Sequence, residues 1–332
     1  MRARAVWFVA PRRVEIGPVD VADDDGRLLV RTIVSGISAG TELLAYRGLI
    51  DPGTPLDEAI GALGGTFAFP FRYGYACVGA VERGADGIEP GTTVFAFHPH
   101  QDVFEVRPQE AIVVDGLEPR SAVLLPLVET ALQVSLDTEA NAGELVLVTG
   151  LGAVGLLTAM LLQRSGADVI GVEPREDRRK LATDLGVVGV EPGEARDLVR
   201  ARSRGDGADV VVEASGRGDT LASSLGLLRH EGLALVASWY GSQPISLPLG
   251  AEFHRRRLTI RSSQVSTIPA RLSARWTRER RTAVVRDLLR ELPLERLATH
   301  VFAFDAAAEA YAALDRAQPG LVHAALTYGS SP

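Results

Sequence analysis

The sequence predicts an α/β protein in which a central, doubly wound parallel sheet is combined with a smaller β-rich domain built from both chain ends. Apolar strands alternate with helices from about residue 121 onward. A glycine-rich turn follows the first clear strand, at residues 150–155. The first 120 residues contain short β segments interrupted by Gly and Pro. Alternation of strands and helices is typical of parallel sheets, and the interrupted segments indicate a separate β-rich domain.

The predicted domain boundaries follow these changes in pattern. We expect residues 1–120 to begin the β-rich domain, residues 121–262 to form the parallel-sheet domain, and residues 263–332 to return to the first domain. In the middle domain we expect strand 145–149, helix 156–164, strand 169–173, helix 177–185, strands 187–190 and 208–214, helix 221–229 and strand 233–238. After it we expect a long arginine-rich helix over 271–296, strand 300–304, helix 306–317 and strand 321–328.

The composition excludes several classes of protein. With 332 residues, 46% of them hydrophobic, and a formal net charge of −7, the chain is long enough for two packed domains and has no general attraction to nucleic acid or anionic membranes. The single cysteine, Cys77, cannot form an intrachain disulfide. The single lysine, Lys180, lies among charged residues, which nearly excludes Schiff-base chemistry. The N-terminus has no signal-peptide pattern, and we expect a cytoplasmic protein without a membrane segment.

The glycine-rich turn predicts a dinucleotide-binding site. Gly150, Gly152 and Gly155 match G-x-G-x-x-G, and Val154 belongs to the same turn. The pattern follows a strand, opens a helix and is followed by a second strand that ends in an acidic residue, as a Rossmann fold requires. Gly150 permits a tight turn, Gly152 lets the backbone approach a pyrophosphate, and Gly155 lets helix and strand pack closely. A purely structural glycine turn is the alternative.

The acidic residue after the second strand predicts which nucleotide is bound. Glu173 stands where a carboxylate accepts hydrogen bonds from the adenosine ribose and repels a 2′-phosphate. Three arginines that follow, Arg175, Arg178 and Arg179, serve a phosphate in the alternative interpretation, although they also fit the charged face of a helix. We therefore expect NAD(H) rather than NADP(H).

The whole chain resembles the medium-chain dehydrogenase/reductase superfamily. Residues 35–42 (SGISAGTE) resemble that family's S-G-I-C-G-T-D, residues 73–76 (YGYA) stand where it has G-H-E, and further similarities cover residues 213–216 and 297–300. The resemblance implies a GroES-like catalytic domain beside the Rossmann domain, a small-molecule substrate and a homodimer. Residues 35–42 are also similar to the branch of bacteriochlorophyllide hydroxyethyl dehydrogenase-like secondary-alcohol dehydrogenases.

The departures from this family predict a member without zinc. The family's cysteine ligand falls at Ser38 or Ala39, its His-Glu pair becomes Tyr75 and Ala76, and its four-cysteine structural lobe is missing. Zinc sites require thiolate, imidazole or carboxylate ligands. Cys77 adjoins the substituted pair, but a single thiol is more often a small buried hydrophobe.

Without zinc, another group must exchange a proton with the substrate oxygen. By the resemblance, Tyr75 replaces a metal ligand and Thr41 aligns with the proton-relay hydroxyl. His98 and His100, in a polar loop, are reserve acid/base candidates. In the alternative interpretation Tyr75 is a core aromatic residue and the two histidines are exposed and inactive. Glu42 aligns with a buried acid, which we expect to be structural.

The remaining candidates line the expected cofactor and substrate pockets. By the resemblance Thr130 packs on the nicotinamide, and Ser215 follows a strand beside the cofactor. Trp239 and Tyr240 follow the carboxyl end of another strand, an edge at which ligands bind. Glu129 reaches the substrate or pairs with an arginine. The expected cofactor set is Gly150, Gly152, Val154, Gly155, Glu173, Thr130, Ser215 and Trp239, and the expected substrate-pocket set is Glu129, Tyr240 and Ser38.

These observations favour a zinc-independent, NAD(H)-dependent oxidoreductase that interconverts a secondary alcohol and a ketone, in a biosynthetic pathway. The first alternative is an NAD(P)H-dependent enoyl or quinone reductase, because metal-free relatives often reduce activated double bonds. The second is a non-catalytic dinucleotide-binding protein, which would bind cofactor without turning over any substrate.

Overall fold

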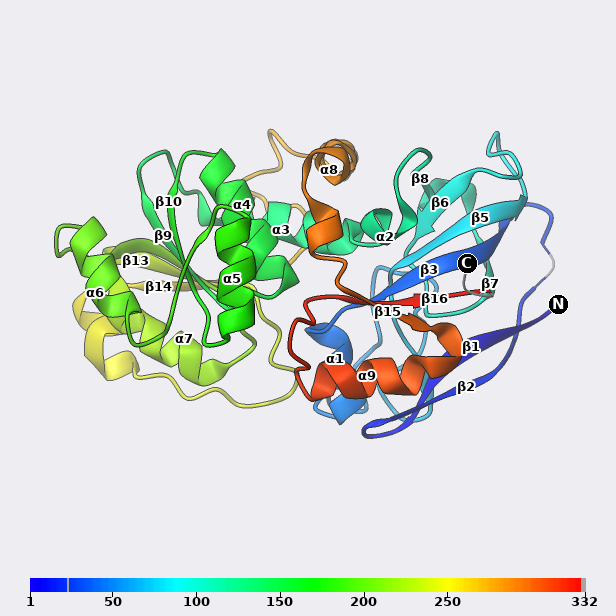
Figure 1. Ribbon diagram of the computed structural model, residues 1–332, viewed down its shortest axis with the longest axis horizontal. Coiled ribbons are helices and arrows are strands. Elements are labelled where there is room, and N and C mark those ends of the chain that lie inside the picture. The colour runs from blue at the N-terminus through cyan, green and yellow to red at the C-terminus, as the bar shows by residue number, and fades with distance from the viewer. Residues whose placement is uncertain (23, 330–332) are drawn as a thin grey trace. The chain divides into compact units, whose positions relative to one another are not determined.

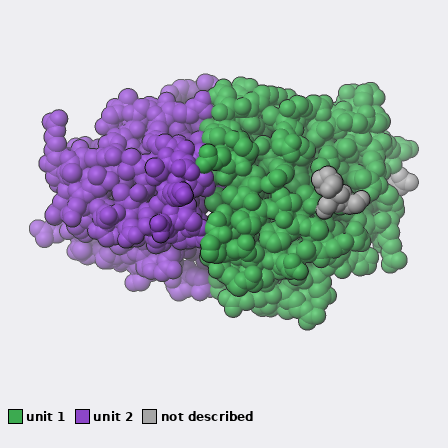
Figure 2. Space-filling view, viewed as in Figure 1, with its two compact units in different colours: residues 1–126, 286–332 green, residues 127–285 purple. Residues whose placement is uncertain are grey.

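The computed structural model describes residues 1–22 and 24–329, and the chain forms two compact units. Unit 1 contains residues 1–126 and 286–332, and unit 2 contains Leu127–Val285, as coloured in Figure 2. The second boundary therefore lies well beyond residue 262, where the sequence predicted it. The reason is a set of contacts within unit 2: Ser263 donates to Asp137 at 2.6 Å, and Arg281 pairs with Glu129 at 3.0 Å.

Unit 2 is built on a parallel sheet in the order β11-β10-β9-β12-β13-β14. Figure 1 labels four of these strands, β9, β10, β13 and β14. Every neighbouring pair in this order is parallel, which confirms the predicted doubly wound sheet. Its strands are β9 (Leu145–Thr149), β10 (Asp168–Val172), β11 (Val188–Val190), β12 (Ala208–Glu213), β13 (Leu228–Val236) and β14 (Thr259–Ser262). Its helices are α4 (Ala153–Arg164), α5 (Glu176–Asp184), α6 (Ala195–Arg202) and α7 (Gly218–Ser224). The unit boundary falls within α3 (Leu125–Thr138) and α8 (Arg278–Glu291).

The central strands form because their residues are apolar on both faces. All five residues of β9 are buried, as expected for a strand that helices cover on both sides. Two expected helices are shorter than the sequence indicated. α7 ends at Ser224 and β13 already begins at Leu228, so the helix predicted over 221–229 is too long. The helix predicted over 271–296 begins at Arg278, because the Thr277 hydroxyl accepts the Arg280 amide at 3.2 Å and caps it.

Unit 1 contains a three-stranded sheet, β2-β1-β4, and a larger mixed sheet in the order β15-β16-β3-β5-β6-β8, with β7 paired to β3. The strands are β1 (Arg2–Ala10), β2 (Arg13–Asp20), β3 (Leu28–Ile37), β4 (Phe71–Arg72), β5 (Cys77–Arg83), β6 (Thr93–Ala96), β7 (Val103–Val106), β8 (Ile112–Val113), β15 (His300–Ala303) and β16 (Ala324–Thr327). The helices are α1 (Thr41–Arg47), α2 (Pro119–Ala122) and α9 (Ala307–Asp315). β16 pairs with β3, which confirms that both chain ends build one domain.

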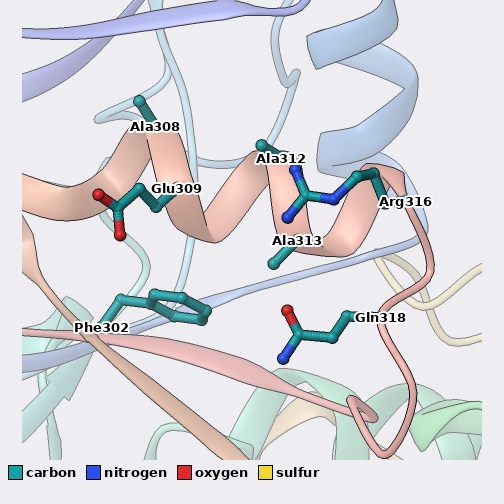
Figure 3. Close-up of a pocket in the computed structure, with 7 residues that line it drawn as sticks. All are labelled: Phe302, Ala308, Glu309, Ala312, Ala313, Arg316 and Gln318. Carbon is teal, nitrogen blue, oxygen red and sulfur yellow. The ribbon is translucent and has the colours of Figure 1, made fainter.

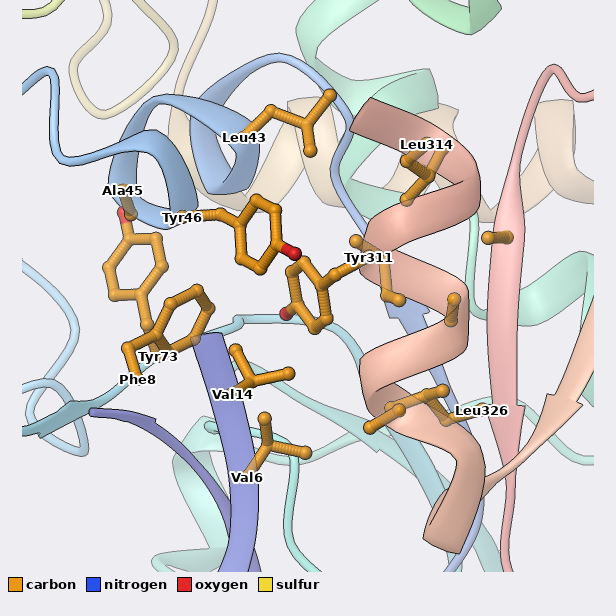
Figure 4. Packing of buried hydrophobic residues seen from close by; sticks show 14 of the residues in the cluster. Val6, Phe8, Val14, Leu43, Ala45, Tyr46, Tyr73, Tyr311, Leu314 and Leu326 are labelled. Atoms are coloured by element: carbon orange, nitrogen blue, oxygen red, sulfur yellow. The ribbon is translucent and has the colours of Figure 1, made fainter. Parts of the chain in front are cut away.

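The main core of unit 1 is rich in aromatic residues and joins both chain ends (Figure 4). Tyr311 of α9 stacks on Tyr46 of α1 at 5.3 Å between ring centroids and meets Phe8 of β1 edge to face at the same distance. Aromatic contacts of this geometry add to the free energy of burial. They also bring α1 and α9 together over β1, which positions the polar groups described below. Among the described residues, the structure contains no helix long and apolar enough to cross a membrane.

Candidate functional site

The glycine turn of unit 2 has the shape of a phosphate cradle. Gly150 has φ +87°, and its amide donates to the Val172 carbonyl at 2.8 Å. A Cβ atom on Gly155 would lie 1.9 Å from the Gly150 carbonyl oxygen, so only glycine fits there. At Gly152, by contrast, the nearest atom to such a Cβ is Arg178 Nη1 at 3.8 Å. The turn is thus tightly packed at two glycines and open at the third, at the N-terminus of α4 where a pyrophosphate binds in related turns.

Glu173 holds this turn in place. Its buried carboxylate accepts the Leu151 amide at Oε2 and the Arg175 amide at Oε1, both at 3.0 Å. Arg178 Nη1 lies 3.7 Å from Oε2, and burial lowers the pKa of the Arg178 guanidinium while Glu173 opposes that shift. The turn therefore presents a fixed carboxylate and a partly desolvated guanidinium together.

A second polar group lies at the carboxyl end of β12. Glu213 is fully buried and accepts hydrogen bonds from the Ser215 amide at 2.7 Å, the Ser215 hydroxyl at 2.6 Å and the Tyr240 hydroxyl at 2.6 Å. Burial and the bond to Glu213 raise the pKa of Tyr240. Trp239, next to Tyr240, is 43% exposed. The structure thus brings Ser215 and Tyr240 together on Glu213, and Trp239 lies in the same segment.

On α3, Glu129 pairs with Arg281 rather than facing solvent. Arg281 is buried, and its guanidinium donates to Glu129 Oε1 at 3.1 Å and to Gln133 Oε1 at 2.8 Å. Burial raises the pKa of Glu129, and the charge of Arg281 opposes that rise. Sequence analysis gave Glu129 two possible roles, contact with the substrate or an ion pair with an arginine, and the structure shows the ion pair. Thr130 follows Glu129 on the same helix.

In unit 1 the structure brings three predicted residues together. Hydrogen bonding to the side chains of Ser38 and Thr41 lowers the pKa of the Tyr75 hydroxyl. We call Ser38, Thr41 and Tyr75 the hydroxyl cluster. Burial and the charge of Glu42 raise the pKa of Tyr75 to about 12, although its two hydrogen bonds favour the ionised form. The phenol is therefore protonated at neutral pH and can donate a proton.

Neither of the two predicted histidines is exposed. His100 is fully buried, with Nδ1 2.7 Å from Ser35 Oγ and Nε2 2.9 Å from Glu42 Oε2. His98 is 9% exposed and stacks on Phe104 at 4.2 Å between ring centroids. Burial lowers the pKa of His98 to about 4, so its ring is neutral at pH 7. The alternative interpretation, in which both histidines are exposed, is wrong, because their segment folds inward between the largely buried strands β6 and β7.

The donor groups at the family's metal position do not fit zinc. By the superfamily resemblance, Ser38 or Ala39, Tyr75 and Ala76 take the places of the metal ligands, and they offer hydroxyl and methyl groups. Neutral hydroxyls are not the thiolate, imidazole or carboxylate ligands that hold zinc in proteins. Cys77 is buried, donates to the carbonyls of His98 and Pro99, and burial raises the pKa of its thiol. In the described part of the chain, no group of three His, Cys, Asp or Glu side chains is placed to hold a metal ion.

A separate groove on unit 1 differs in character (Figure 3). Phe302 and alanines of α9 form its apolar wall, while Glu309 and Arg316 lie toward opposite ends in Figure 3. Both charged side chains are exposed. The groove therefore lacks the desolvated groups that characterise the hydroxyl cluster.

Two residues that the sequence did not point to, Tyr311 and Arg281, contact site residues that lie far from them in the chain. Tyr311 donates to Glu42 from the other end of the chain, and Arg281 reaches Glu129 from a different helix. The sequence around Glu129 contains one indication of the Arg281 site: Glu129 and Gln133 are four positions apart and therefore share one face of a helix.

The fold and the glycine turn define the class of protein: a Rossmann-type unit joined to a GroES-like β-rich unit. A family model described as zinc-binding dehydrogenase matches residues 153–279. D-guloside 3-dehydrogenase of Escherichia coli K12 is 30% identical over 168 residues, which cover 48% of this chain and 47% of that enzyme. The chain thus matches about half the length of this curated relative.

Solved structures extend the likeness to the whole fold. An alcohol dehydrogenase from Escherichia coli CFT073, complexed with NADH, is 17% identical with a TM-score of 0.77 and covers 98% of this chain and 99% of its own. A protein from Sinorhizobium meliloti 1021, bound to NADP, is 19% identical with a TM-score of 0.77 and covers 99% and 100%. The matched segment and this fold make the chain similar to zinc-binding dehydrogenases and to alcohol dehydrogenases of known structure.

Proposed function

We propose that this chain is a zinc-independent, NAD(H)-dependent oxidoreductase that interconverts a secondary alcohol and a ketone. The observation that carries the proposal is the hydroxyl cluster, in which Tyr75 bonds to Ser38 and Thr41 at the position where the superfamily resemblance puts metal ligands. The substrate class is supported by the relative named D-guloside 3-dehydrogenase. The donor set at this position does not fit zinc, which favours a proton donor of the chain's own.

Unit 2 is proposed to hold the dinucleotide. Gly152 leaves the N-terminus of α4 open for the pyrophosphate, Val154 lies in the first turn of that helix, and Glu173 takes the adenosine ribose. Thr130, Ser215 and Trp239 are proposed to contact the nicotinamide half. When bound, the dinucleotide supplies or accepts the hydride.

The hydroxyl cluster is proposed to handle the proton. In ketone reduction, Tyr75 donates its phenolic proton to the carbonyl oxygen as the carbonyl carbon is reduced. Thr41 and Ser38 then donate hydrogen bonds to the phenolate until it regains a proton from water. In alcohol oxidation, the phenolate accepts the hydroxyl proton. Because the pKa of Tyr75 is about 12, the cluster serves ketone reduction better at neutral pH.

The proposal is tested with purified protein, a panel of secondary alcohols and ketones, and elemental analysis. We expect ketone-dependent oxidation of NADH, less than about 0.1 zinc per chain, and unchanged activity after treatment with a chelator. About one zinc per chain with activity lost on chelation contradicts zinc independence. Turnover of enones or quinones alone supports the reductase alternative, and cofactor binding without turnover supports a binding protein.

We propose that Glu173 sets the preference for NAD(H). Since relatives with this fold bind NADH or NADP, the preference depends on this chain's own residues. Glu173→Gln retains one acceptor oxygen for the Leu151 amide but removes the charge, and Arg178 then meets a 2′-phosphate without an opposing carboxylate. We expect NADPH affinity to rise about 10-fold, measured by quenching of tryptophan fluorescence.

The matched control for this experiment is Glu191→Gln, which removes an exposed carboxylate that pairs with Arg179. It is expected to leave the ratio of the two affinities unchanged. Tighter binding of NADPH than NADH by the unchanged protein contradicts the role of Glu173. The homodimer, the cytoplasmic location, the biosynthetic role and the bacteriochlorophyllide-related branch stay predictions.

A further inference from the structure

His100 lies between the two chain segments that carry the hydroxyl cluster. Its backbone amide donates to the Tyr73 carbonyl at 3.2 Å, two residues before Tyr75. Its ring Nε2 is 2.9 Å from Glu42 Oε2, and Glu42 follows Thr41 directly in α1. One buried residue therefore contacts both the segment before Tyr75 and the segment after Thr41.

Glycine at position 74 allows this close approach. Gly74 has φ +103°, and a Cβ atom there would lie 2.5 Å from His100 Cδ2 and 2.6 Å from Nε2. The imidazole thus packs directly against the backbone beside Tyr75. Any side chain at position 74 would push the ring away from Glu42 or move the backbone that carries Tyr75.

Glu42 is the point at which these contacts meet. Its Oε1 accepts the backbone amide of Ser38 at 2.8 Å, and its Oε2 accepts the Tyr311 hydroxyl as well as facing His100. The carboxylate is fully buried. It therefore fixes the backbone at Ser38, while His100 holds the backbone at Tyr73 and Gly74, directly before Tyr75.

The outer nitrogen of His100 is also engaged. Nδ1 lies 2.7 Å from Ser35 Oγ, which in turn lies 2.8 Å from the Tyr328 hydroxyl. Both ring nitrogens therefore have protein partners, and neither is left to exchange a proton with a substrate. Apolar packing alone would not require an imidazole with two directed hydrogen bonds at this position.

We propose that His100 and Glu42 act as a positioning pair, which holds the hydroxyls of Ser38, Thr41 and Tyr75 at hydrogen-bonding distance from one another. The part of this inference that concerns rate rests on the proposed function. The part that concerns the environment of Tyr75 does not, because it can be measured without a substrate. His100 is thus a positioning residue rather than the reserve acid/base that the sequence suggested.

The charges around Tyr75 determine the sign of each expected effect. Glu42 and Asp57 raise its pKa, the hydrogen bonds from Ser38 and Thr41 lower it, and Tyr73 packs edge to face on its ring. Losing His100 while Glu42 keeps its charge weakens the hydrogen bonds and raises the pKa of Tyr75 further. Losing only the Glu42 charge lowers it.

The test replaces Tyr75 by 3,5-difluorotyrosine, whose phenol ionises near neutrality, and follows its absorbance against pH. In this background His100→Leu is expected to raise the phenol pKa by about one unit, while His100→Gln, which retains a donor for Glu42, stays within about 0.3 unit. His323→Leu, at another buried histidine of unit 1, is the control and is expected to cause no shift. In the protein with Tyr75 intact, His100→Leu is expected to lower kcat about 10-fold or more with KM little changed, and His100→Gln is expected to restore most of it.

A folded His100→Leu variant with an unchanged phenol pKa overturns the proposal, as does a His100→Gln variant that shifts as far as His100→Leu. If His100→Leu does not fold, His100→Asn decides: it keeps a polar side chain that is too short to reach both Glu42 and Ser35, the phenol pKa is expected to rise by about one unit, and no shift overturns the proposal. If the wild-type protein turns over no substrate, the proposed function fails, but the titration still tests the positioning pair.

Discussion

Tyr75→Phe is expected to lower kcat for ketone reduction at least about 100-fold while the melting temperature and the dinucleotide affinity stay at their wild-type values. The change removes only the hydroxyl that bonds to Ser38 and Thr41. The ring remains to pack against Tyr73, which it meets edge to face at 6.1 Å between centroids. Steady-state kinetics, thermal unfolding and a fluorescence titration of NADH measure the three quantities.

The control for this substitution is Tyr73→Phe, which removes a neighbouring phenolic hydroxyl and is expected to retain kcat within about 3-fold. The pH dependence provides a second check. Because the pKa of Tyr75 is about 12, ketone reduction should stay constant on the alkaline side up to about pH 10, whereas alcohol oxidation should accelerate as the phenolate becomes populated. Normal turnover by Tyr75→Phe would contradict the proton role and favour the alkene-reductase interpretation.

Two glycine substitutions are expected to have different effects: Gly152→Ala should weaken NADH binding, and Gly155→Ala should lower the free energy of unfolding. Gly152→Ala adds a methyl group with 3.8 Å to its nearest neighbour, so the free energy of unfolding should change by less than about 1 kcal/mol. The same methyl group blocks the approach of a pyrophosphate, and NADH affinity should fall about 100-fold or more. Gly155→Ala places its Cβ 1.9 Å from the Gly150 carbonyl oxygen and should destabilise the protein by about 2 kcal/mol or more.

Urea unfolding and NADH titration of both variants measure these effects. Unchanged NADH affinity in Gly152→Ala would show that the turn does not bind the pyrophosphate. An unchanged free energy of unfolding in Gly155→Ala would show that the turn and α4 can move apart to accommodate the methyl group. That result would contradict the close packing of these elements.

Local patterns were sufficient to predict the parallel sheet. β9 is apolar up to Thr149 and Gly150 follows it directly, so strand, turn and helix were all visible within 20 residues. The resemblance to the superfamily brought Ser38, Thr41 and Tyr75 together, which neither composition nor periodicity indicated. These features could be predicted because each is encoded by residues that are close together in the chain or by a known family motif.

The environment of His100 was not predictable in this way. Glu42 lies 58 residues before it, and nothing near either residue indicates the contact. A histidine in the segment Phe97–Asp102 is typical of an exposed loop, but here the segment crosses a buried interior. Similarly, the arginines over 271–296 suggested one long helix, whereas Thr277 caps α8, which covers only Arg278–Glu291.

The pairing of β16 with β3 has a consequence for how this protein is made. β3 leaves the ribosome early, but its antiparallel neighbour on one side is Ala324–Thr327, near the other end of the chain. Tyr311 follows Glu42 by 269 residues, so at ordinary rates of synthesis the carboxylate lacks this donor for on the order of tens of seconds. During that time one edge of β3 is open to incorrect pairing. Unit 2 can be synthesised in full before unit 1 can close, so the environment of the hydroxyl cluster is completed last.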